Sequence, residues 1–266
     1  MFSPEWLSLR EPADTAARSE ALTGALVDAL PGGRAVRILD LGSGTGANAR
    51  YLFPRLRTGQ EWLLADNDAA LLSLVGDRLT SADGRTFQVA TRRADLSILD
   101  DENLFRNRQL VTASALLDLV SESWLRLLAA RCREAGAIAL FTLTYDGRSS
   151  CDPVEPEDDI VRELMNVHQK TDKGLGGRAE GPDAWSVAER VFTEAGFRVE
   201  CAPSNWSIGP PERTFQRMLI EGWARAAVEI APERADTIAD WLRRRLEHLE
   251  AGQSRIVVNH VDMVAW

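Results

Sequence analysis

Short apolar segments that suit buried strands alternate along the chain with segments whose apolar residues recur at helical spacing. The clearest example begins at residues 36–41 (VRILDL), an apolar run that predicts a buried strand. A glycine-rich turn follows, and residues 48–57 then carry Tyr51, Leu52 and Leu56 on one side of a predicted helix. Similar steps predict further strands at 62–65, 86–91, 110–113 and 135–145. This alternation is typical of an α/β fold with a mostly parallel sheet.

The two ends of the chain complete this pattern. Residues 197–206 and 255–266 predict a sixth and a seventh strand. Residues 11–30 predict a leading helix, because their apolar positions follow helical spacing and Pro31-Gly32-Gly33 ends the run. The chain is therefore expected to end on a strand.

Two segments, 146–182 and 210–252, fit neither a strand nor a core helix, and we expect substrate specificity to lie there. In the second, two apolar faces at helical spacing predict a helical hairpin, with Pro211 and Pro232 in first-turn positions. The hairpin either covers the open edge of the sheet or presents its apolar stripe to a second copy of the chain. We expect a single domain over 1–266, with a lid insertion at 146–182 and a helical-hairpin insertion at 210–252.

Composition narrows the class of protein. The 266 residues are 45% hydrophobic, which is enough to bury the core of one such domain, and the net charge of −9 disfavours a surface built for nucleic acid or anionic membrane. The N-terminal segment is too polar and acidic for a signal or transit peptide, and no run of 18 apolar residues occurs. We expect a cytoplasmic protein with no nucleic-acid or membrane partner. The oligomeric state stays open.

The cysteines add no chemistry to this picture. Cys132, Cys151 and Cys201 are odd in number and lack metal or redox spacing, so we expect reduced structural thiols and no metal site.

The turn after the first strand carries the strongest candidate chemistry. Gly42, Gly44 and Gly46 occupy alternate positions after Asp40. Glycines without a Cβ let the backbone adopt unusual φ/ψ values and let a ligand approach closely. With Ala47 the same residues also fit the dinucleotide pattern G-x-G-x-x-A, so the turn by itself leaves a nicotinamide or flavin enzyme open.

Asp40 and the three glycines resemble the first motif of the class I S-adenosylmethionine-dependent methyltransferases, an acid-x-Gly-x-Gly-x-Gly. The resemblance implies a Rossmann-like three-layer sandwich with a mostly parallel seven-stranded sheet, whose last strand runs antiparallel between strands five and six. A dinucleotide fold needs a second βαβαβ half, whereas a chain that ends on a strand fits the methyltransferase plan. The expected cofactor is S-adenosyl-L-methionine.

An acid follows the second predicted strand at the spacing expected for a ribose ligand. Asp66 falls 20 residues after Gly46, and a carboxylate there can accept hydrogen bonds from both ribose hydroxyls. Asp68 offers an alternative, but it also suits a helix cap, which leaves Asp66 as the predicted ligand.

Other cofactor residues are implied by the resemblance. Asp95 would bond the adenine amino group, Leu96 would cover the ring, and Arg18 would reach the cofactor carboxylate. The alternatives are a loop aspartate, an anchoring leucine and a solvated surface arginine. The predicted cofactor residues are Arg18, Asp40, Gly42, Ser43, Gly44, Asn48, Asp66, Asn67, Asp95, Leu96 and Ser114.

The segment after the fourth strand should face the site. Methyltransferases that act on adenine or glutamine resemble one another in an Asn/Asp-Pro-Pro-Tyr run here, whereas this chain has Ser114-Ala115-Leu116-Leu117. That chemistry is disfavoured. Asp118 either contacts substrate or is an ordinary acid at a helix start.

The lid is expected to contribute His168. Pro156 and the acids after it suit a helix start, and Val161, Met165 and His168 then share one face, so the imidazole points inward as a pocket residue or a core histidine. Lys173 lies beside several glycines and could reach an anionic substrate. The predicted catalytic residues are His168 and Tyr145, and the predicted substrate residues are Asp118, Tyr145, His168 and Lys173.

These observations favour methyl transfer to a small-molecule acceptor by in-line displacement, since the lid is short, the surface is acidic and no nucleic-acid module is attached. The departing sulfur becomes neutral and needs no acid, so positioning supplies most of the catalysis. The alternatives are a protein or RNA methyltransferase and a chain that binds S-adenosylmethionine without transferring its methyl group.

Overall fold

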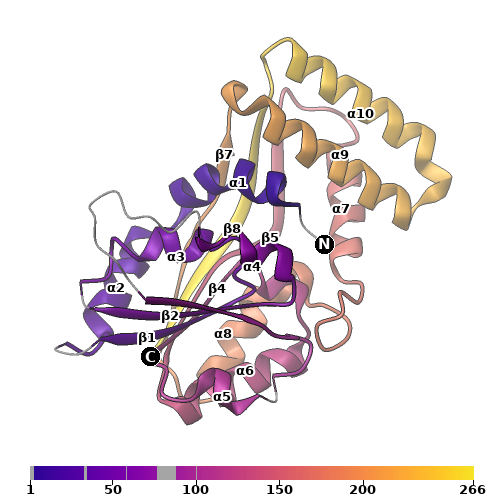
Figure 1. Cartoon of the computed structure of the whole chain (residues 1–266). Coiled ribbons are helices and arrows are strands. Elements are labelled where there is room, and N and C mark those ends of the chain that lie inside the picture. Colours follow the sequence, from indigo (N-terminus) through magenta and orange to yellow (C-terminus); the bar gives the residue numbers. More distant parts are fainter. Residues whose placement is uncertain (1–2, 33–34, 58, 77–87, 100) are drawn as a thin grey trace.

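An eight-stranded sheet runs through the centre of the molecule (Figure 1). The computed structural model describes residues 3–32, 35–57, 59–76, 88–99 and 101–266. The sheet has the order β3-β2-β1-β4-β5-β8-β6, and β7 also pairs with β8. The strands are β1 Val36–Leu41, β2 Gln60–Asp66, β3 Gln88–Arg93, β4 Leu110–Ser114, β5 Ile138–Asp152, β6 Val199–Pro203, β7 Trp206–Ile208 and β8 Arg255–Ala265.

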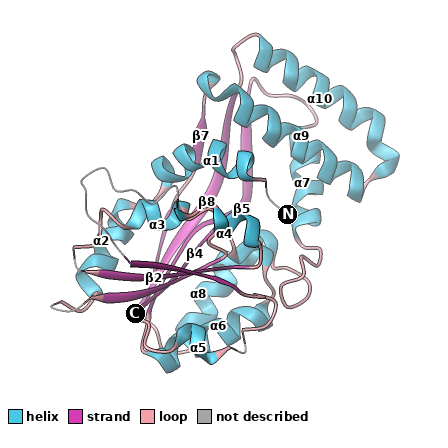
Figure 2. Cartoon of the chain, viewed as in Figure 1, coloured by secondary structure: helices cyan, strands magenta, loops and turns pink. Residues whose placement is uncertain are grey.

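Helices cover both faces of the sheet, which makes three layers (Figure 2). The α-helices of the described residues are α1 Pro4–Ala17, α2 Glu20–Ala29, α3 Ala47–Leu52, α4 Ala69–Ser73, α5 Glu102–Phe105, α6 Glu122–Ala135, α7 Asp158–Gln169, α8 Ala184–Glu194, α9 Arg213–Ile230 and α10 Ala235–Glu250. Successive residues of a strand point to opposite faces. Leu39 of β1 therefore packs in the core under α6 and α8, whereas Ile38 packs in the core under α2 and α3.

The strand plan agrees with the expectation from the sequence. Neighbours among β1 to β5 pair in parallel, and β8 runs antiparallel between β5 and β6. Parallel strands covered on both faces are expected to be mainly apolar, and β1 and β4 are largely so, although β1 carries Arg37 and Asp40 and β4 carries Thr112 and Ser114. Of the third predicted strand, 86–91, residues 86 and 87 lie outside the described residues, and β3 continues to Arg93. The Rossmann-like prediction is confirmed.

The sixth predicted strand, 197–206, is two strands instead of one. β6 ends at Pro203, the chain turns through Ser204 and Asn205, and β7 then pairs with the first half of β8. Proline has no N–H to donate to a strand ladder, which makes it a natural end for β6. The sheet consequently has eight strands where the sequence predicted seven.

The leading helix, predicted at 11–30, is also two elements. α1 begins at Pro4, where the Ser3 side chain accepts a hydrogen bond from the backbone N–H of Trp6, and it passes through Pro12. Ser19 then caps α2 by accepting a hydrogen bond from Leu22 N. Serine oxygens satisfy N–H groups that have no partner within a helix, and this fixes both starts.

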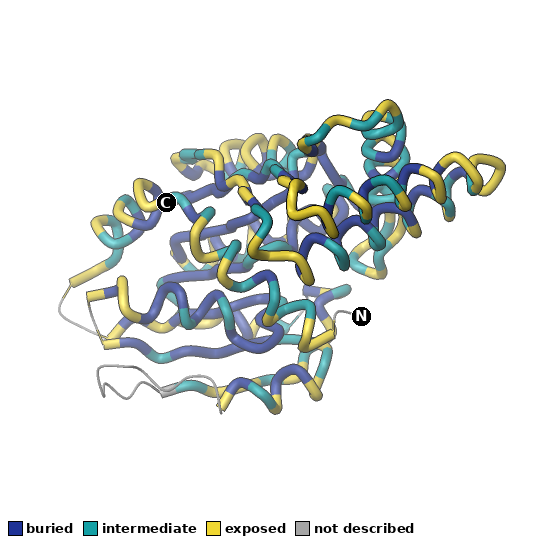
Figure 3. The backbone as a smooth tube through the Cα atoms, turned by 90° about the horizontal axis from the view of Figure 1, so that it is seen from above, coloured by how far each residue is buried: buried dark blue, intermediate teal, exposed yellow. Residues whose placement is uncertain are grey.

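The strands β5, β7 and β8 extend beyond the rest of the sheet and carry α7, α9 and α10 (Figure 1). β5 continues to Asp152, so residues 146–152, predicted as the start of the lid, belong to the sheet. The lid helix α7 and the hairpin α9–α10 both form as predicted. Buried residues run along the central strands, and exposed residues gather on the outer sides of the helices (Figure 3).

The apolar stripe of the hairpin is buried within the chain. Phe215, Ile220 and Trp223 of α9 and Trp241 of α10 belong to one cluster with α1, α7 and the extended strands. The buried part of the stripe therefore packs within the chain, which favours the alternative in which the hairpin covers the sheet. A buried ion pair also ties the hairpin to α7, because the fully buried Arg245 pairs with Asp158. No helix among the described residues is long and apolar enough to cross a membrane.

Candidate functional site

The glycine turn between β1 and α3 is held in a left-handed conformation. Gly42, Gly44 and Gly46 have φ values of +63°, +52° and +82°, which side chains rarely adopt. The turn is also closely covered, since a Cβ at Gly44 would lie 3.2 Å from Leu7 Cδ1 of α1 and one at Gly42 would lie 3.3 Å from Leu116 Cδ1. A side chain at either glycine would require Leu7 or Leu116 to move by a few tenths of an ångström, in addition to adopting a strained φ.

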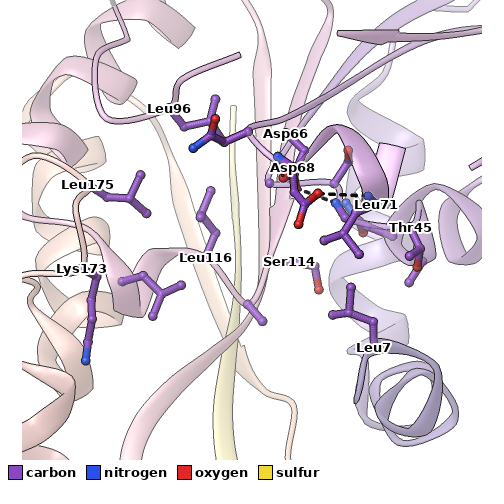
Figure 4. Close-up of a pocket in the computed structure, with 18 of the residues that line it drawn as sticks. Leu7, Thr45, Asp66, Asp68, Leu71, Leu96, Ser114, Leu116, Lys173 and Leu175 are labelled. Carbon is purple, nitrogen blue, oxygen red and sulfur yellow. Dashed lines mark hydrogen bonds between the residues drawn. The ribbon is translucent and has the colours of Figure 1, made fainter. Parts of the chain in front are cut away.

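A cavity of about 480 Å³ lies beside this turn, at the carboxyl ends of β1, β2 and β4. In Figure 4, Leu7 and Thr45 lie on one side of it, and Lys173 and Leu175 lie on the other. All the predicted cofactor residues except Arg18 and Asp40 line this cavity. Open α/β sheets bind ligands outside the carboxyl ends of their strands, so the position suits a cofactor.

Asp66, at the end of β2, is oriented by backbone amides. Its Oδ2 accepts a hydrogen bond of 2.8 Å from Gly44 N, and its Oδ1 accepts one of 2.9 Å from Asp68 N. Asp68 caps α4 by accepting hydrogen bonds from Ala70 N and Leu71 N, which confirms the helix-cap assignment. A carboxylate has about four lone-pair sites. Asp66 therefore keeps acceptor capacity for a ligand in the cavity.

Asp95 and Leu96 line the cavity from the loop after β3. Asp95 is exposed, and its Oδ1 accepts a hydrogen bond of 2.9 Å from Ser97 N. Hydrogen bonding from the Ser97 side chain, and then from its backbone N–H, lowers the pKa of the Asp95 carboxyl. Leu96 is buried, and its carbonyl accepts a hydrogen bond of 2.6 Å from Trp124 Nε1 of α6. Asp95 and Leu96, which are adjacent in the sequence, thus place an acid and an apolar side chain at the same wall of the cavity.

Arg18 and Asp40 lie behind the cavity wall and reach it through Asn48. Arg18 Nη1 donates to Asn48 Oδ1 at 2.9 Å, and Asn48 Nδ2 donates to Asp40 Oδ1 at 2.7 Å. The Arg18 side chain is 2% exposed, so the surface-arginine alternative is wrong. Burial raises the pKa of Asp40 to about 7. Only Asn48 of these three side chains lines the cavity.

A second cavity of about 330 Å³ adjoins the first. The two share the lining residues Arg10, Ala115, Leu119 and Lys173. Its walls come from α1, the segment after β4, β5, α7, the loop after α7, β7, α9 and β8, and every predicted substrate residue lies on them. These residues are Asp118, Tyr145, His168 and Lys173.

Asp118 is the buried acid of the second cavity. It lies in the 3-10 turn Leu117–Leu119 and is 8% exposed, and its Oδ1 has no hydrogen-bond partner among the described residues. Burial raises its pKa to about 6. An unpaired buried carboxylate oxygen is costly. This oxygen is therefore an acceptor to which a donor in the cavity could bind.

The other predicted substrate residues already contact one another or their neighbours. Tyr145 donates its hydroxyl to Asn166 Oδ1 at 2.9 Å, and burial raises the pKa of the phenol. His168 Nε2 lies 3.0 Å from Glu229 Oε2, and Lys173 Nζ lies 3.0 Å from the His168 carbonyl. The His168 side chain is 27% exposed, so this residue is not a packed core histidine.

Sequence reasoning missed two contributions to the cavities. The first is α1, whose Trp6 and Arg10 line the second cavity; Ser3-Pro4, a cap followed by a first-turn proline, is the signal that marks this helix. The second is His260 of β8, which is buried; desolvation lowers its pKa to about 3 and keeps the ring neutral. No sequence signal distinguishes His260 from an ordinary strand residue.

Two residues that line the second cavity hold strained backbone, and one of them, Ala115, also lines the first cavity. Ala115 has φ of +52° and Leu143 has φ of +57°, although both carry a Cβ. Leu143 lies at a bulge in β5, where its N–H donates to Asp262 Oδ1 at 2.8 Å. Such outliers persist where the surrounding structure fixes them, and they cluster at functional sites.

Comparisons with known proteins place the fold. No protein-family model matches the chain, and no curated protein matches it. The cyclopropane synthase MmaA2 from Mycobacterium tuberculosis is similar in structure, with a TM-score of 0.53 and 14% identity over 100% of this chain and 95% of that chain. Together with the strand order, this similarity shows that the chain has the Rossmann-like methyltransferase fold.

Weaker structural similarities extend to two further proteins. The YcgJ protein from Bacillus subtilis has a TM-score of 0.49 and 14% identity over 93% of this chain and 98% of that chain. A SAM-dependent methyltransferase from Geobacter sulfurreducens, in complex with S-adenosyl-L-homocysteine, has a TM-score of 0.46 and 16% identity over 98% of each chain.

Proposed function

We propose that this chain is an S-adenosyl-L-methionine-dependent methyltransferase that acts on a small-molecule acceptor. The observation that carries the proposal is the junction of two unlike cavities. The first is built from the glycine turn and from acids at strand ends, and the second is built from aromatic and titratable side chains. They meet at Arg10, Ala115, Leu119 and Lys173, which gives a cofactor and an acceptor a common boundary.

The residues of the first cavity fit the parts of this cofactor. Asp66 has lone pairs left for the two ribose hydroxyls after it accepts from Gly44 N and Asp68 N. Asp95 would accept from the adenine amino group, and Leu96 would cover the ring. Gly44 has a positive φ, and because glycine has no Cβ, the cofactor can approach its backbone closely.

Arg18 and Asp40 would act through Asn48 and would not touch the cofactor directly. Their hydrogen bonds to the two ends of the Asn48 amide fix its orientation at the cavity wall. This role revises the sequence-based expectation for Arg18, in which the guanidinium itself reached over the cofactor carboxylate.

The chain would contribute chiefly by holding two reactants in line. The cofactor would supply a methyl group on a sulfonium, whose departure leaves a neutral sulfur. α1 covers the glycine turn, and the loop with Lys173 and Leu175 closes the opposite wall, so both exclude water from the boundary. Orientation of this kind can supply several kcal/mol of the reduction in barrier, about 7 or more in favourable cases.

Tyr145 and His168 are proposed as orienting groups in the acceptor cavity. Burial keeps the Tyr145 phenol protonated, so it serves as a hydrogen-bonding group and not as a base. His168 is positioned between Glu229 and Lys173, an arrangement that is satisfied when Nε2 donates to Glu229 and Nδ1 accepts from Lys173. The size and enclosure of this cavity favour a small molecule over a protein or RNA side group.

Two measurements test the proposal. Isothermal titration calorimetry should show binding of S-adenosyl-L-homocysteine and no binding of NAD. Incubation with methyl-labelled S-adenosyl-L-methionine and a metabolite extract should then label a small product. Binding without any transfer would indicate a non-catalytic cofactor-binding protein, label on protein or RNA would indicate the macromolecular alternative, and absence of cofactor binding would refute the proposal.

A further inference from the structure

The second cavity carries one acidic and one basic side chain that face it without pairing. Asp118 and Lys173 both line it, and no ion pair joins them in the part of the chain that the structure describes. Burial raises the pKa of Asp118 and lowers that of Lys173. The charges of Arg10 and Lys173 oppose the shift at Asp118, and the charges of Glu229 and Asp118 oppose the shift at Lys173, so the two groups lie close enough to affect each other. Opposite charges that are close but not in contact leave room for a ligand between them.

Asp118 provides the acceptor for the positive end of such a ligand. The side chain is more than nine-tenths buried, it lines the cavity, and its Oδ1 lacks a donor among the described residues. A ligand N–H would satisfy this oxygen with a charge-assisted hydrogen bond.

Lys173 provides a donor for the negative end. Its Nζ contacts two atoms of His168, the carbonyl at 3.0 Å and Nδ1 at 3.4 Å. An ammonium has three N–H donors, so one remains for a ligand. The chain has only one other lysine, Lys170, which pairs with Asp183 at 2.5 Å and does not line the cavity.

The remaining titratable groups on the cavity wall are paired or neutral. Arg10 is held by Asp14 through two hydrogen bonds of 2.9 and 3.2 Å, so its charge is compensated. Burial keeps Tyr145 protonated and His260 uncharged. Asp118 and Lys173 are therefore the two charged groups of this wall that form no ion pair with any described residue.

Most of the rest of the wall is apolar, with both aromatic and aliphatic side chains. Trp6, Tyr145, Trp206 and Trp223 come from four different elements and line the same space. Trp206 also packs against His260, with ring centroids 4.6 Å apart. Flat rings of this kind favour an apolar or planar body.

From this arrangement we infer that the second cavity binds a small zwitterion, an α-amino acid or similar amino acid with an apolar body. Its ammonium lies at Asp118, its carboxylate lies at Lys173, and its body lies among the aromatic side chains. The inference rests on the proposed function, because it names the acceptor class for that site.

A matched series of three probes tests the inference on the unmodified protein. L-Phenylalanine carries both charges, phenethylamine lacks the carboxylate, and 3-phenylpropionate lacks the ammonium. Quenching of tryptophan fluorescence, checked by calorimetry, gives the affinity of each. We expect phenethylamine and 3-phenylpropionate to bind about tenfold more weakly than L-phenylalanine, since each loses one charge-assisted hydrogen bond. Equal affinities, or no binding of L-phenylalanine, would overturn the inference.

Substitutions assign the two ends. Asp118→Asn should weaken L-phenylalanine and phenethylamine about tenfold and spare 3-phenylpropionate, and Lys173→Met should weaken L-phenylalanine and 3-phenylpropionate and spare phenethylamine. Lys170→Met is the matched control and should change none of the three. Effects that do not follow the charge of the probe would contradict the assignment.

Binding of S-adenosyl-L-homocysteine, measured on the same proteins, tests the proposed function separately from the zwitterion inference. Failure of the unmodified protein to bind it would refute the proposed function, whatever the probes do. Intact binding with no discrimination among the probes would refute only the zwitterion inference. Because the probe series needs no substitution, the result stands even if a variant does not fold.

Discussion

The two cavities of this protein are built in different ways. The first takes its walls from short loops at the ends of strands β1 to β4, and its shape depends largely on backbone conformation and on amides that point at Asp66. The second takes its walls from side chains of elements as far apart in the sequence as α1 and β8. The first therefore depends mainly on features that are local in the sequence, whereas the second depends on tertiary packing. Substitutions should separate cofactor binding from acceptor binding.

The largest effect is expected at Asp66. Asp66→Ala removes a charged acceptor for two hydroxyls and should weaken S-adenosyl-L-homocysteine binding by about 2 to 4 kcal/mol in calorimetry. The matched control is Asp101→Ala, which removes an acid that caps α5 and does not line the cavity. Unchanged affinity in a folded Asp66→Ala protein would remove the ribose assignment.

A pH effect should arise from Asp118 in the second cavity. Burial raises its pKa to about 6 in the folded protein, above the ordinary value of 3.8. The folded state thus binds more protons between these two values, and the free energy of unfolding should fall as the pH rises from about 4 to about 6. Asp118→Asn should remove this loss, which is about 2 kcal/mol. Denaturant unfolding of both proteins at pH 4 and pH 7 measures the difference; parallel pH curves would show that Asp118 titrates normally.

A smaller effect is expected at Gly44 in the first cavity. Gly44→Ala places a Cβ at a positive φ and against Leu7, at a cost of about 1 to 2 kcal/mol. If the turn serves the cofactor, the loss of binding free energy for S-adenosyl-L-homocysteine should exceed the loss of stability that the melting temperature of the free protein reports. Unfolding of the free variant would instead show that this glycine is needed for the fold alone.

The smallest effect is expected at His168. His168→Ala should lower turnover or raise KM by a factor that corresponds to about 1 kcal/mol of free energy, while cofactor affinity stays unaltered. His248→Ala serves as the control. His248 Nε2 lies 2.7 Å from Glu155 Oε1, and neither residue lines either cavity. Normal activity per folded molecule, with lower stability, would mark His168 as a packing residue.

The difference between the cavities also explains how far sequence reasoning could reach. Strand runs, the glycine spacing and Asp66 are local features, so the fold and most of the first cavity could be predicted from them. Arg18 was expected to reach the cofactor carboxylate, whereas its guanidinium lies in a buried network with Asn48 and Asp262. Residues so far apart in the sequence leave no local pattern from which this network could be predicted.

The second cavity could be predicted only in part. The helical spacing of α7 brought His168 to the correct wall, but Trp6 and His260 reach that wall only through tertiary packing. The helix predicted at 11–30 leaves out residues 4–10, whereas α1 begins at Pro4 and passes through Pro12.

The most direct test is a crystal structure of the protein with S-adenosyl-L-homocysteine. The account predicts density in the first cavity, with the ribose at Asp66, the adenine beside Asp95 and Leu96, and the sulfur toward the boundary formed with Ala115 and Leu119. Density in the second cavity or elsewhere, or a ribose that does not contact Asp66, would contradict the assignment of the two sites.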